Sequence, residues 1–337
     1  MSSIMLAIKM GSTNTTIFKQ NEGFTLIEPS LVAVTSTAHG KEIIAVGKNA
    51  KKLLSKTSDN IINVFSPISE GIIADTDMAS AMLKEFVIKV CPKKIFKPNI
   101  RALVCVPLGI SLTERLAFEK VCYNAGITDV VLVPSIICSA IGIGKDIASD
   151  KLSLIVGIGG GCTDIAIIGQ NMLINGVNVG MGGQNIDHAI VQQILSTYNL
   201  VISDETAEKL KKEIGSLYIN DLNEYEITGK DSETSETRSV IVTATDIYPA
   251  VEHYYSKICE TILSLLATCS PDINAEISNS GIAFVGGDSK IPGIEKYYKA
   301  KLNLEVTSFL DAEDLEMIGA SNLLSNPTSL KRLLINI

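Results

Sequence analysis

Two glycine-rich turns hold the residues of this sequence that are best suited to chemistry. The first turn, GSTN at 11–14, separates two β-rich runs within residues 4–18, and the second, GGG at 159–161, does the same within residues 152–168. Each pattern predicts a β-hairpin, because a tight turn needs glycine or small polar residues. Such a turn gathers backbone N–H groups without side-chain obstruction, so each hairpin could bind a phosphate.

A third glycine-rich segment extends this pattern. The residues FVGGDSKIPGI (284–294) read as a strand, a Gly-Gly turn and the start of a helix. Two hairpins could hold a polyphosphate between them while the third element lines the site of a base. Lys9 and Gly157 occupy equivalent places in the two hairpins, 148 positions apart, which predicts two related lobes. The alternative is three ordinary turns that share no ligand.

Alternating strands and helices must position these turns. A capping box, in which Ser111 precedes Glu114 by three residues, starts a helix that stops at Gly126. Strands on either side of it make a strand–helix–strand unit, and the second half adds two amphipathic helices. The other predicted ranges are strands at 102–107 and 130–135, helices at 186–195 and 207–214, and an exposed hairpin or loop at 223–239.

Composition limits the class of protein. A chain of 337 residues, 46% of them hydrophobic, can form about two folded domains. Its net charge of −8 argues against a nucleic-acid partner. We expect no membrane span and no secretory signal, because no apolar run of about 18 residues occurs and the N-terminus lacks the signal pattern. Seven scattered cysteines and three histidines predict free thiols in a reducing cytoplasm and no metal centre.

The sequence resembles the MreB-like bacterial actins, within the superfamily of actin, chaperone and sugar-kinase ATPases. The resemblance implies an α/β, actin-like fold with two duplicated ribonuclease-H-like lobes around a nucleotide cleft, each with a smaller inserted subdomain. The stretches that carry it are IEPSLVAV (27–34), AVGKNAKKLL (45–54), SPISEGIIADTDMASAML (66–83), VPLGISLTER (106–115), GIGGGCTDIAII (157–168) and TAEKLKKEIGS (206–216). The implied boundaries are 1–145 for the first lobe (insert about 31–69, returning C-terminal helix about 312–337) and 146–311 for the second (insert about 181–248).

The same resemblance implies a site for ATP or ADP. Glu208 and Lys211 match a Glu-x-x-Lys that lies beside the adenosine in MreB-like proteins, although from spacing alone Glu208 with Lys211 or Lys212 would be an ordinary surface ion pair. The expected nucleotide-binding residues are Lys9, Gly11, Ser12, Thr13, Asn14, Thr15, Gly159, Gly160, Gly161, Glu208, Lys211, Gly286, Gly287, Asp288 and Ser289.

Four positions depart from the catalytic pattern of the family. Lys9 and Gly157 stand where the family has the aspartates on the Mg²⁺ side. Ser135 stands at the place of the carboxylate that orients the attacking water, and Cys162 at the place of a threonine. Phosphoryl transfer relies on positioning and electrostatic stabilisation, so we expect no intact catalytic residue and a pseudo-ATPase or very slow ATPase.

The departure at Lys9 has two interpretations. In one, its ammonium lies where Mg²⁺ would otherwise neutralise phosphate charge, and bound metal would not be required. In the other, Lys9 merely fills an emptied site and the affinity for nucleotide is low. Nucleotide affinity with and without Mg²⁺ separates the two.

A basic segment with an apolar centre predicts contact with a membrane. Ile95 and Phe96 are flanked by Lys93, Lys94 and Lys97. Each lysine near an anionic bilayer contributes about 1 kcal/mol. The matching loop of MreB proteins contacts membranes. The alternative is that the apolar pair packs inward under a solvated basic loop.

These features together lead to an expected function. The resemblance implies a filament-forming, membrane-associated cytoskeletal protein of cell shape or motility, located in the cytoplasm at the inner face of the cell membrane. Its expected partners are copies of itself, other MreB paralogues and an anionic membrane. A catalytically degenerate paralogue is the narrower expectation. The alternatives are a chaperone-type ATPase of the actin fold, because GGDSKIP (286–292) resembles the chaperone element, and a small-molecule kinase of the same superfamily.

Overall fold

The computed structural model describes residues 3–37, 40–54, 62–92 and 99–335. Its strands are β1 (Ser3–Met10), β2 (Asn14–Lys19), β3 (Gly23–Pro29), β4 (Val32–Thr37), β5 (Gly40–Val46), β6 (Ile62–Phe65), β7 (Ile68–Ser69), β8 (Ile72–Ile73), β9 (Asn99–Val106), β10 (Asp129–Pro134), β11 (Ser153–Ile158), β12 (Thr163–Gly169), β13 (Met172–Val179), β14 (Leu200–Val201), β15 (Glu224–Asp231), β16 (Thr237–Thr243), β17 (Ile282–Val285) and β18 (Val306–Thr307).

The helices alternate with these strands, as an α/β pattern requires. They are α1 (Lys48–Lys51), α2 (Thr76–Val90), α3 (Leu112–Asn124), α4 (Ser135–Gly142), α5 (Gly183–Tyr198), α6 (Asp204–Ile214), α7 (Ala244–Ala267), α8 (Pro271–Ser280), the 3₁₀ helix η2 (Gly287–Lys290), α9 (Ile294–Leu302), α10 (Leu315–Ser325) and α11 (Pro327–Ile335).

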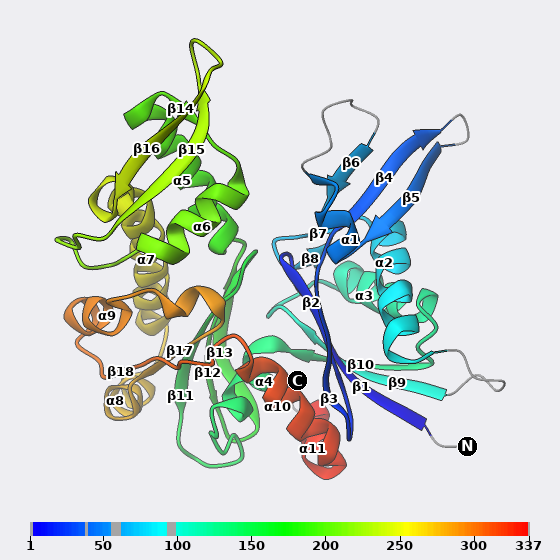
Figure 1. Ribbon diagram of the computed structural model, residues 1–337. Helices are drawn as coiled ribbons and strands as arrows, with labels where there is room; N and C mark the ends of the chain where they lie inside the picture. The colour runs from blue at the N-terminus through cyan, green and yellow to red at the C-terminus, as the bar shows by residue number, and fades with distance from the viewer. Residues whose placement is uncertain (1–2, 38–39, 55–61, 93–98, 336–337) are drawn as a thin grey trace.

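Two five-stranded sheets with the same topology form the centre of the molecule (Figure 1). Their strand orders are β10-β9-β1-β2-β3 and β18-β17-β11-β12-β13. In each sheet an antiparallel hairpin lies next to two parallel strands. The registers pair Lys9 with Thr16 in the first hairpin and Gly157 with Asp164 in the second. The predicted hairpins and the duplication of the two lobes are therefore confirmed.

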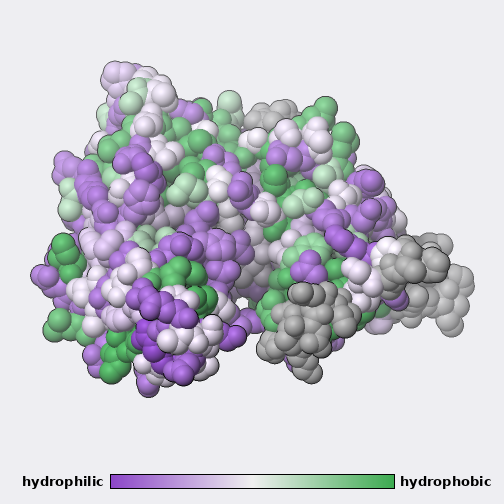
Figure 2. All heavy atoms as spheres, turned by 90° about the horizontal axis from the view of Figure 1, so that it is seen from above, coloured by the Kyte–Doolittle hydropathy of each residue, from purple (hydrophilic) through white to green (hydrophobic). Residues whose placement is uncertain are grey.

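Two smaller sheets lie above the central ones in Figure 1, on either side of the molecule. One is β5-β4-β6, and the other is β14-β15-β16, in which the polar stretch at 223–239 forms the predicted hairpin. Seen from above, hydrophilic and hydrophobic residues are interspersed over both halves (Figure 2). None of the described helices has the length and apolar character needed to cross a membrane.

The capping box at the start of α3 is present as predicted. The Ser111 hydroxyl accepts a hydrogen bond from the Glu114 backbone N–H, and Glu114 Oε2 accepts one from the Ser111 N–H at 2.6 Å. These bonds satisfy N–H groups that have no partner within the helix. After α3, Gly126 adopts φ 93°, a left-handed conformation that favours glycine.

A core cluster between the two central sheets joins them. Ala7 and Leu103 come from the first sheet, Ile155 and Ala166 come from the second, and side chains of α4 and α10 complete the cluster. The chain passes from one sheet to the other after α4 and returns before α10, and both helices lie between the sheets in Figure 1. The core of the molecule is therefore continuous across the boundary between the sheets.

Glycines allow α4 and α10 to approach backbone to backbone. A Cβ on Gly319 would overlap the Cys138 carbonyl oxygen, and one on Gly142 would overlap that of Leu315. Any larger side chain at either position would push the two helices apart. This crossing therefore fixes the position of the first turn of α10 relative to the start of α4.

The returning C-terminal helix expected at about 312–337 is two helices, which corrects the prediction of one. The chain leaves helical geometry at Asn326, with φ −127° and ψ 81°, and α11 begins at Pro327. Proline lacks the N–H that would continue α10, but it fits the first position of a new helix. The break follows directly from that residue.

Candidate functional site

The turns of the two hairpins face each other. A Cβ on Gly160 would overlap Thr13 Oγ1, and a Cβ on Gly161 would overlap Ser12 Oγ. Glycine at both positions is therefore what lets the second turn come so close to the first. The structure brings together the two turns that the sequence singled out.

Hydrogen bonds within the first turn and to neighbouring segments hold it in place. Gly11 N donates to the Asn14 carbonyl at 3.0 Å, and Gly71 N donates to Ser12 Oγ at 3.0 Å. The buried Thr15 hydroxyl lies 2.8 Å from Ser30 Oγ. Ser12 and Thr15 thus act through the local structure, whereas the side chain of Asn14 is exposed.

The second turn is held by the N-terminus of α5. Gly183 N donates to the Gly159 carbonyl at 2.9 Å, and Gln184 N donates to the Gly160 carbonyl at 2.8 Å. A Cβ on Gly182 would lie 2.5 Å from the carbonyl carbon of Gly160. The first backbone N–H groups of a helix lack partners within it, and here they fix the turn.

Two of the altered catalytic positions meet at a single carboxylate. Lys9 Nζ lies 2.6 Å from Glu316 Oε2, and the Ser135 hydroxyl donates to Glu316 Oε1 at 2.8 Å. The Lys9 side chain is 29% exposed and that of Glu316 is 10% exposed. Burial of the ammonium favours its neutral form, but the charge and hydrogen bond of Glu316 outweigh that effect and raise the pKa of Lys9. Lys9 therefore remains a cation at neutral pH.

Glu316 is a residue that the sequence interpretation missed. It lies in α10, LEMIGASNLLS, and a single acidic residue within an apolar helix was the only available signal. No motif contains Glu316, and 181 positions separate it from Ser135.

The other two altered positions carry no charge of their own. A Cβ on Gly157 would lie 3.2 Å from Ile136 Cδ1 and 3.5 Å from Val285 Cγ2. Burial, and then the negative charge of Asp164, raise the pKa of the Cys162 thiol to about 12, so it is neutral. Neither position supplies a charge to the site.

Asp164 is a second residue that the sequence interpretation missed. It is only 5% exposed, and burial raises its pKa to about 6 although two hydrogen bonds favour its charged form. Leu108 N donates to its Oδ1 at 3.0 Å, and Asn178 Nδ2 donates to the same oxygen at 2.7 Å. Through Leu108, Asp164 links the second sheet to the loop that follows β9.

Mg²⁺ does not fit the residues present at this place. In the parts of the chain that the structure describes, no three or more His, Cys, Asp or Glu side chains are grouped so that they could hold a metal ion. An ammonium repels a divalent cation, and Lys9 presents one between the first turn and Glu316. Of the two positions expected on the metal side, Lys9 is therefore in an ion pair and Gly157 lies against apolar side chains.

The third turn and the predicted Glu-x-x-Lys meet through buried charges. Lys211 Nζ lies 2.9 Å from Asp187 Oδ1 and 2.8 Å from Asp288 Oδ1, and it donates to the Gly183 carbonyl at 3.0 Å. Burial raises the pKa of Asp187 to about 6, against the opposing charge of Lys211. This network connects α6, the third turn and the N-terminal part of α5, and the sequence interpretation missed Asp187.

The remaining predicted residues of this region have separate contacts. Glu208 pairs with Lys212 at 2.5 Å rather than with Lys211, and its side chain is 31% exposed. The Ser289 hydroxyl is buried and donates to the Gly286 carbonyl at 2.7 Å, so it shapes the turn. Gly287 is exposed. The predicted membrane residues Lys93, Lys94, Ile95, Phe96 and Lys97 lie outside the described residues.

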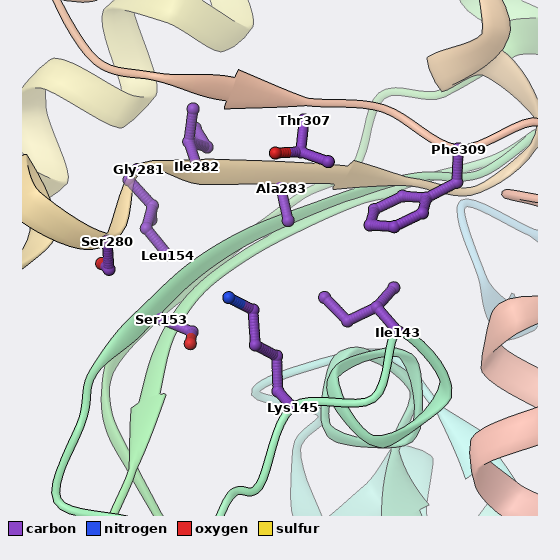
Figure 3. A pocket seen from close by; sticks show the side chains of 10 residues that line it. All are labelled: Ile143, Lys145, Ser153, Leu154, Ser280, Gly281, Ile282, Ala283, Thr307 and Phe309. Carbon is purple, nitrogen blue, oxygen red and sulfur yellow. The ribbon is translucent and has the colours of Figure 1, made fainter.

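A cavity of about 180 Å³ lies away from these turns, between the end of α4 and the starts of β11 and β17 (Figure 3). Lys145 extends into it toward Ser153 and the neighbouring strands. None of the predicted nucleotide-binding residues lines this cavity.

Comparisons with known proteins agree with this architecture. The family model described as MreB/Mbl protein matches residues 3–332. The cell shape-determining protein MreB of Escherichia coli strain K12 is 32% identical over 304 residues, covering 89% of this chain and 87% of its own. The cell shape-determining protein Mbl of Bacillus subtilis strain 168 is 29% identical over 329 residues, covering 97% of each chain.

Similarity to a solved structure extends over the whole chain. The crystal structure of MreB5 of Spiroplasma citri bound to AMPPNP superposes with a TM-score of 0.90 at 27% identity and covers 100% of both chains. The predicted actin-like, two-lobed fold is thereby confirmed. The chain belongs to the MreB/Mbl family.

Proposed function

We propose that this chain binds ATP or ADP without a divalent metal, hydrolyses ATP very slowly or not at all, and works as an MreB-like cytoskeletal protein of cell shape or motility. The observation that carries the proposal is the Lys9–Glu316 ion pair, because the resemblance implies an aspartate on the Mg²⁺ side at the position of Lys9. Structures of MreB5 bound to AMPPNP and to ADP support the choice of an adenine nucleotide.

Binding would use the groups that the fold brings together. The backbone of the two turns, with Thr13 and Asn14 at the surface of the first, would contact phosphates. The segment from Gly286 to Asp288 would lie beside the base and ribose, near the Lys211 network. Lys9 supplies a positive charge close to the first turn, because its Cε would lie 3.8 Å from a Cβ on Gly11.

Hydrolysis would lack a group to orient water. Ser135, at the position where the resemblance implies the carboxylate that orients water, carries a neutral hydroxyl, and its one proton is donated to Glu316. A general base takes a proton from the attacking water, and a neutral serine hydroxyl is too weak a base for that role. These contacts favour a nucleotide-binding protein over an efficient ATPase.

The direct test is nucleotide affinity with and without metal. We expect the dissociation constants of ATP and ADP, measured by calorimetry, to differ less than about threefold between millimolar Mg²⁺ and excess EDTA. Phosphate release should stay close to the background without protein. A strong requirement for Mg²⁺ together with rapid phosphate release would overturn the proposal.

Assembly and membrane binding are the other parts of the proposed function. Membership of the MreB/Mbl family supports homopolymer filaments, possible co-assembly with other MreB paralogues and a position at the inner face of the cell membrane. Electron microscopy with and without nucleotide should detect filaments. A persistent monomer that phosphorylates a small substrate would instead favour the kinase alternative, and nucleotide-dependent release of bound peptide would favour the chaperone alternative.

Liposome binding tests the basic segment separately. Co-sedimentation with anionic vesicles should be abolished by Ile95→Ser together with Phe96→Ser, because the apolar pair would enter the bilayer interface. Vesicles made only of zwitterionic lipid are the control, since they lack the charge that Lys93, Lys94 and Lys97 would contact. Unchanged sedimentation of the double variant would contradict membrane contact by this segment.

A further inference from the structure

We propose that Glu316 is an internal counter-anion that competes with the phosphates of the nucleotide for the ammonium of Lys9. This inference rests on the proposed nucleotide binding and concerns regulation at the same site. Glu316 would then be a positioning residue, because it sets the affinity of the metal-free site for nucleotide. Since Glu316 lies in α10, binding of the nucleotide would also affect that helix.

The geometry places Lys9 between two possible anions. Its ammonium lies 2.6 Å from Glu316, while its aliphatic chain runs beside the turn at Gly11. With 29% of the side chain exposed, Lys9 is accessible from the solvent side of the turns. A rotation of the flexible lysine side chain, without movement of the backbone, would carry its charge from Glu316 toward the turn.

Glu316 cannot follow the ammonium in the same way. Its carboxylate accepts the Ser135 hydroxyl at 2.8 Å, and its helix crosses α4 in backbone contact at Gly142 and Gly319. A carboxylate held by this hydrogen bond, on a helix fixed by backbone packing, remains in place when its cation moves. Nucleotide binding would therefore leave a buried carboxylate without its cation, which is unfavourable.

The other ionisable groups around Lys9 do not replace either partner. Cys105 and Cys162 are neutral thiols, since burial and neighbouring groups hold their pKa values high. Asp164, which is bonded to Leu108 and Asn178, and Asp314, at the start of α10, interact with Lys9 through their charge, whereas the ion pair of Lys9 is with Glu316. Competition for the ammonium thus involves Glu316 on one side and a phosphate on the other.

The substitution Glu316→Gln separates competition from a purely structural role. Glutamine keeps the shape and an oxygen that accepts the Ser135 hydroxyl, but it no longer neutralises Lys9. We expect the dissociation constant of ADP, measured by calorimetry in EDTA, to fall at least threefold. A structural role alone would weaken binding instead.

Glu305→Gln is the matched control. It removes the same charge from an exposed ion pair with Lys299 at the edge of the second sheet, and it should leave the affinity within the error of the wild type. An equal gain in both variants would mean that net charge alone is responsible, and an unchanged or weaker affinity in Glu316→Gln would mean that no competition exists. Either result overturns the inference.

Amide hydrogen exchange provides a second measurement on the same proteins. In the wild type, ADP should increase exchange in the first turn of α10, because Glu316 loses its cation. In Glu316→Gln, ADP should leave exchange in α10 unchanged. If ADP binds the wild type and α10 does not respond, the competition is wrong while the proposed nucleotide binding stands. If ADP binds neither protein, both are wrong.

Discussion

The two hairpins share one topology but carry charges of opposite sign on different strands. In the first, Lys9 pairs across the strands with Thr16, and in the second, Gly157 pairs with Asp164. The first hairpin thus carries a cation on its first strand, and the second carries a buried carboxylate on its second strand. The first is joined to α10 by the ion pair Lys9–Glu316.

This difference concerns the two positions at which the resemblance leads us to expect a family carboxylate. At the first, Lys9 carries a positive charge and has a partner in α10. At Gly157 the space lies against Ile136 and Val285, so nothing polar replaces the lost group. The proposed backbone contacts of both turns with phosphates depend on turn geometry, and Lys9 would add a charge to the first turn.

The largest expected effect concerns the support of the second turn. Gly182→Ala should lower the free energy of unfolding by about 3 kcal/mol, because the new methyl group would lie 2.5 Å from backbone atoms of Gly160. Urea denaturation measures the change. Gly287→Ala, where no atom lies within 4 Å of the added Cβ, is the control and should change stability by less than about 0.5 kcal/mol. Similar losses in both variants would contradict the close contact at Gly182.

The buried carboxylate of the second hairpin predicts a pH dependence of stability. Burial raises the pKa of Asp164 to about 6 in the folded protein, so folding takes up a proton there. Its contribution to stability is complete below pH of about 4 and is lost as the pH rises through about 6. Relative to Asp164→Asn, the wild type should lose up to about 3 kcal/mol between pH of about 4 and 7. Parallel pH profiles of the two proteins would refute this.

The ion pair of the first hairpin predicts coupling between distant positions. Lys9→Met should lower the free energy of unfolding by about 2 kcal/mol, because it leaves the carboxylate of Glu316 buried without a cation. Adding Glu316→Gln to Lys9→Met should recover at least half of the loss, since no buried charge remains. Losses that simply add in a double-mutant cycle would show that the pair contributes nothing.

The smallest effect is expected at the position equivalent to Lys9 in the second hairpin. Gly157→Ala should change the free energy of unfolding by less than about 1 kcal/mol, because the added methyl group meets only the flexible end of Ile136 and the side chain of Val285. Thermal unfolding measures it. A loss of unfolding free energy as large as that of Lys9→Met would mean that Gly157 contributes as much to stability as the Lys9 ion pair.

Local patterns predicted most of the fold. Small residues at the two turns, the capping box before α3 and the apolar runs each have a nearby physical cause, so the hairpins and the strand–helix–strand unit followed from them. The break at Pro327 has a local cause too, but the prediction of one C-terminal helix overlooked it.

The electrostatics of the candidate site could not be predicted in the same way. Glu316 reaches Ser135 only because two helices cross at glycines, and Asp164 is bonded to Leu108 from the other sheet. Both contacts depend on tertiary packing between distant segments. Spacing along the chain contains no information about them, so the chemical character of the altered positions became clear only from the structure.

The placement of α10 has a consequence for synthesis of the protein. The core between the central sheets includes side chains of Leu315 and Ala320, which leave the ribosome after the residues of β18. The first sheet is complete in sequence at Pro134 but cannot cover that face until α10 arrives. Because domains tend to fold as units from the N-terminus during translation, the first lobe should wait as an unfinished intermediate, available to chaperones until α10 has been synthesised.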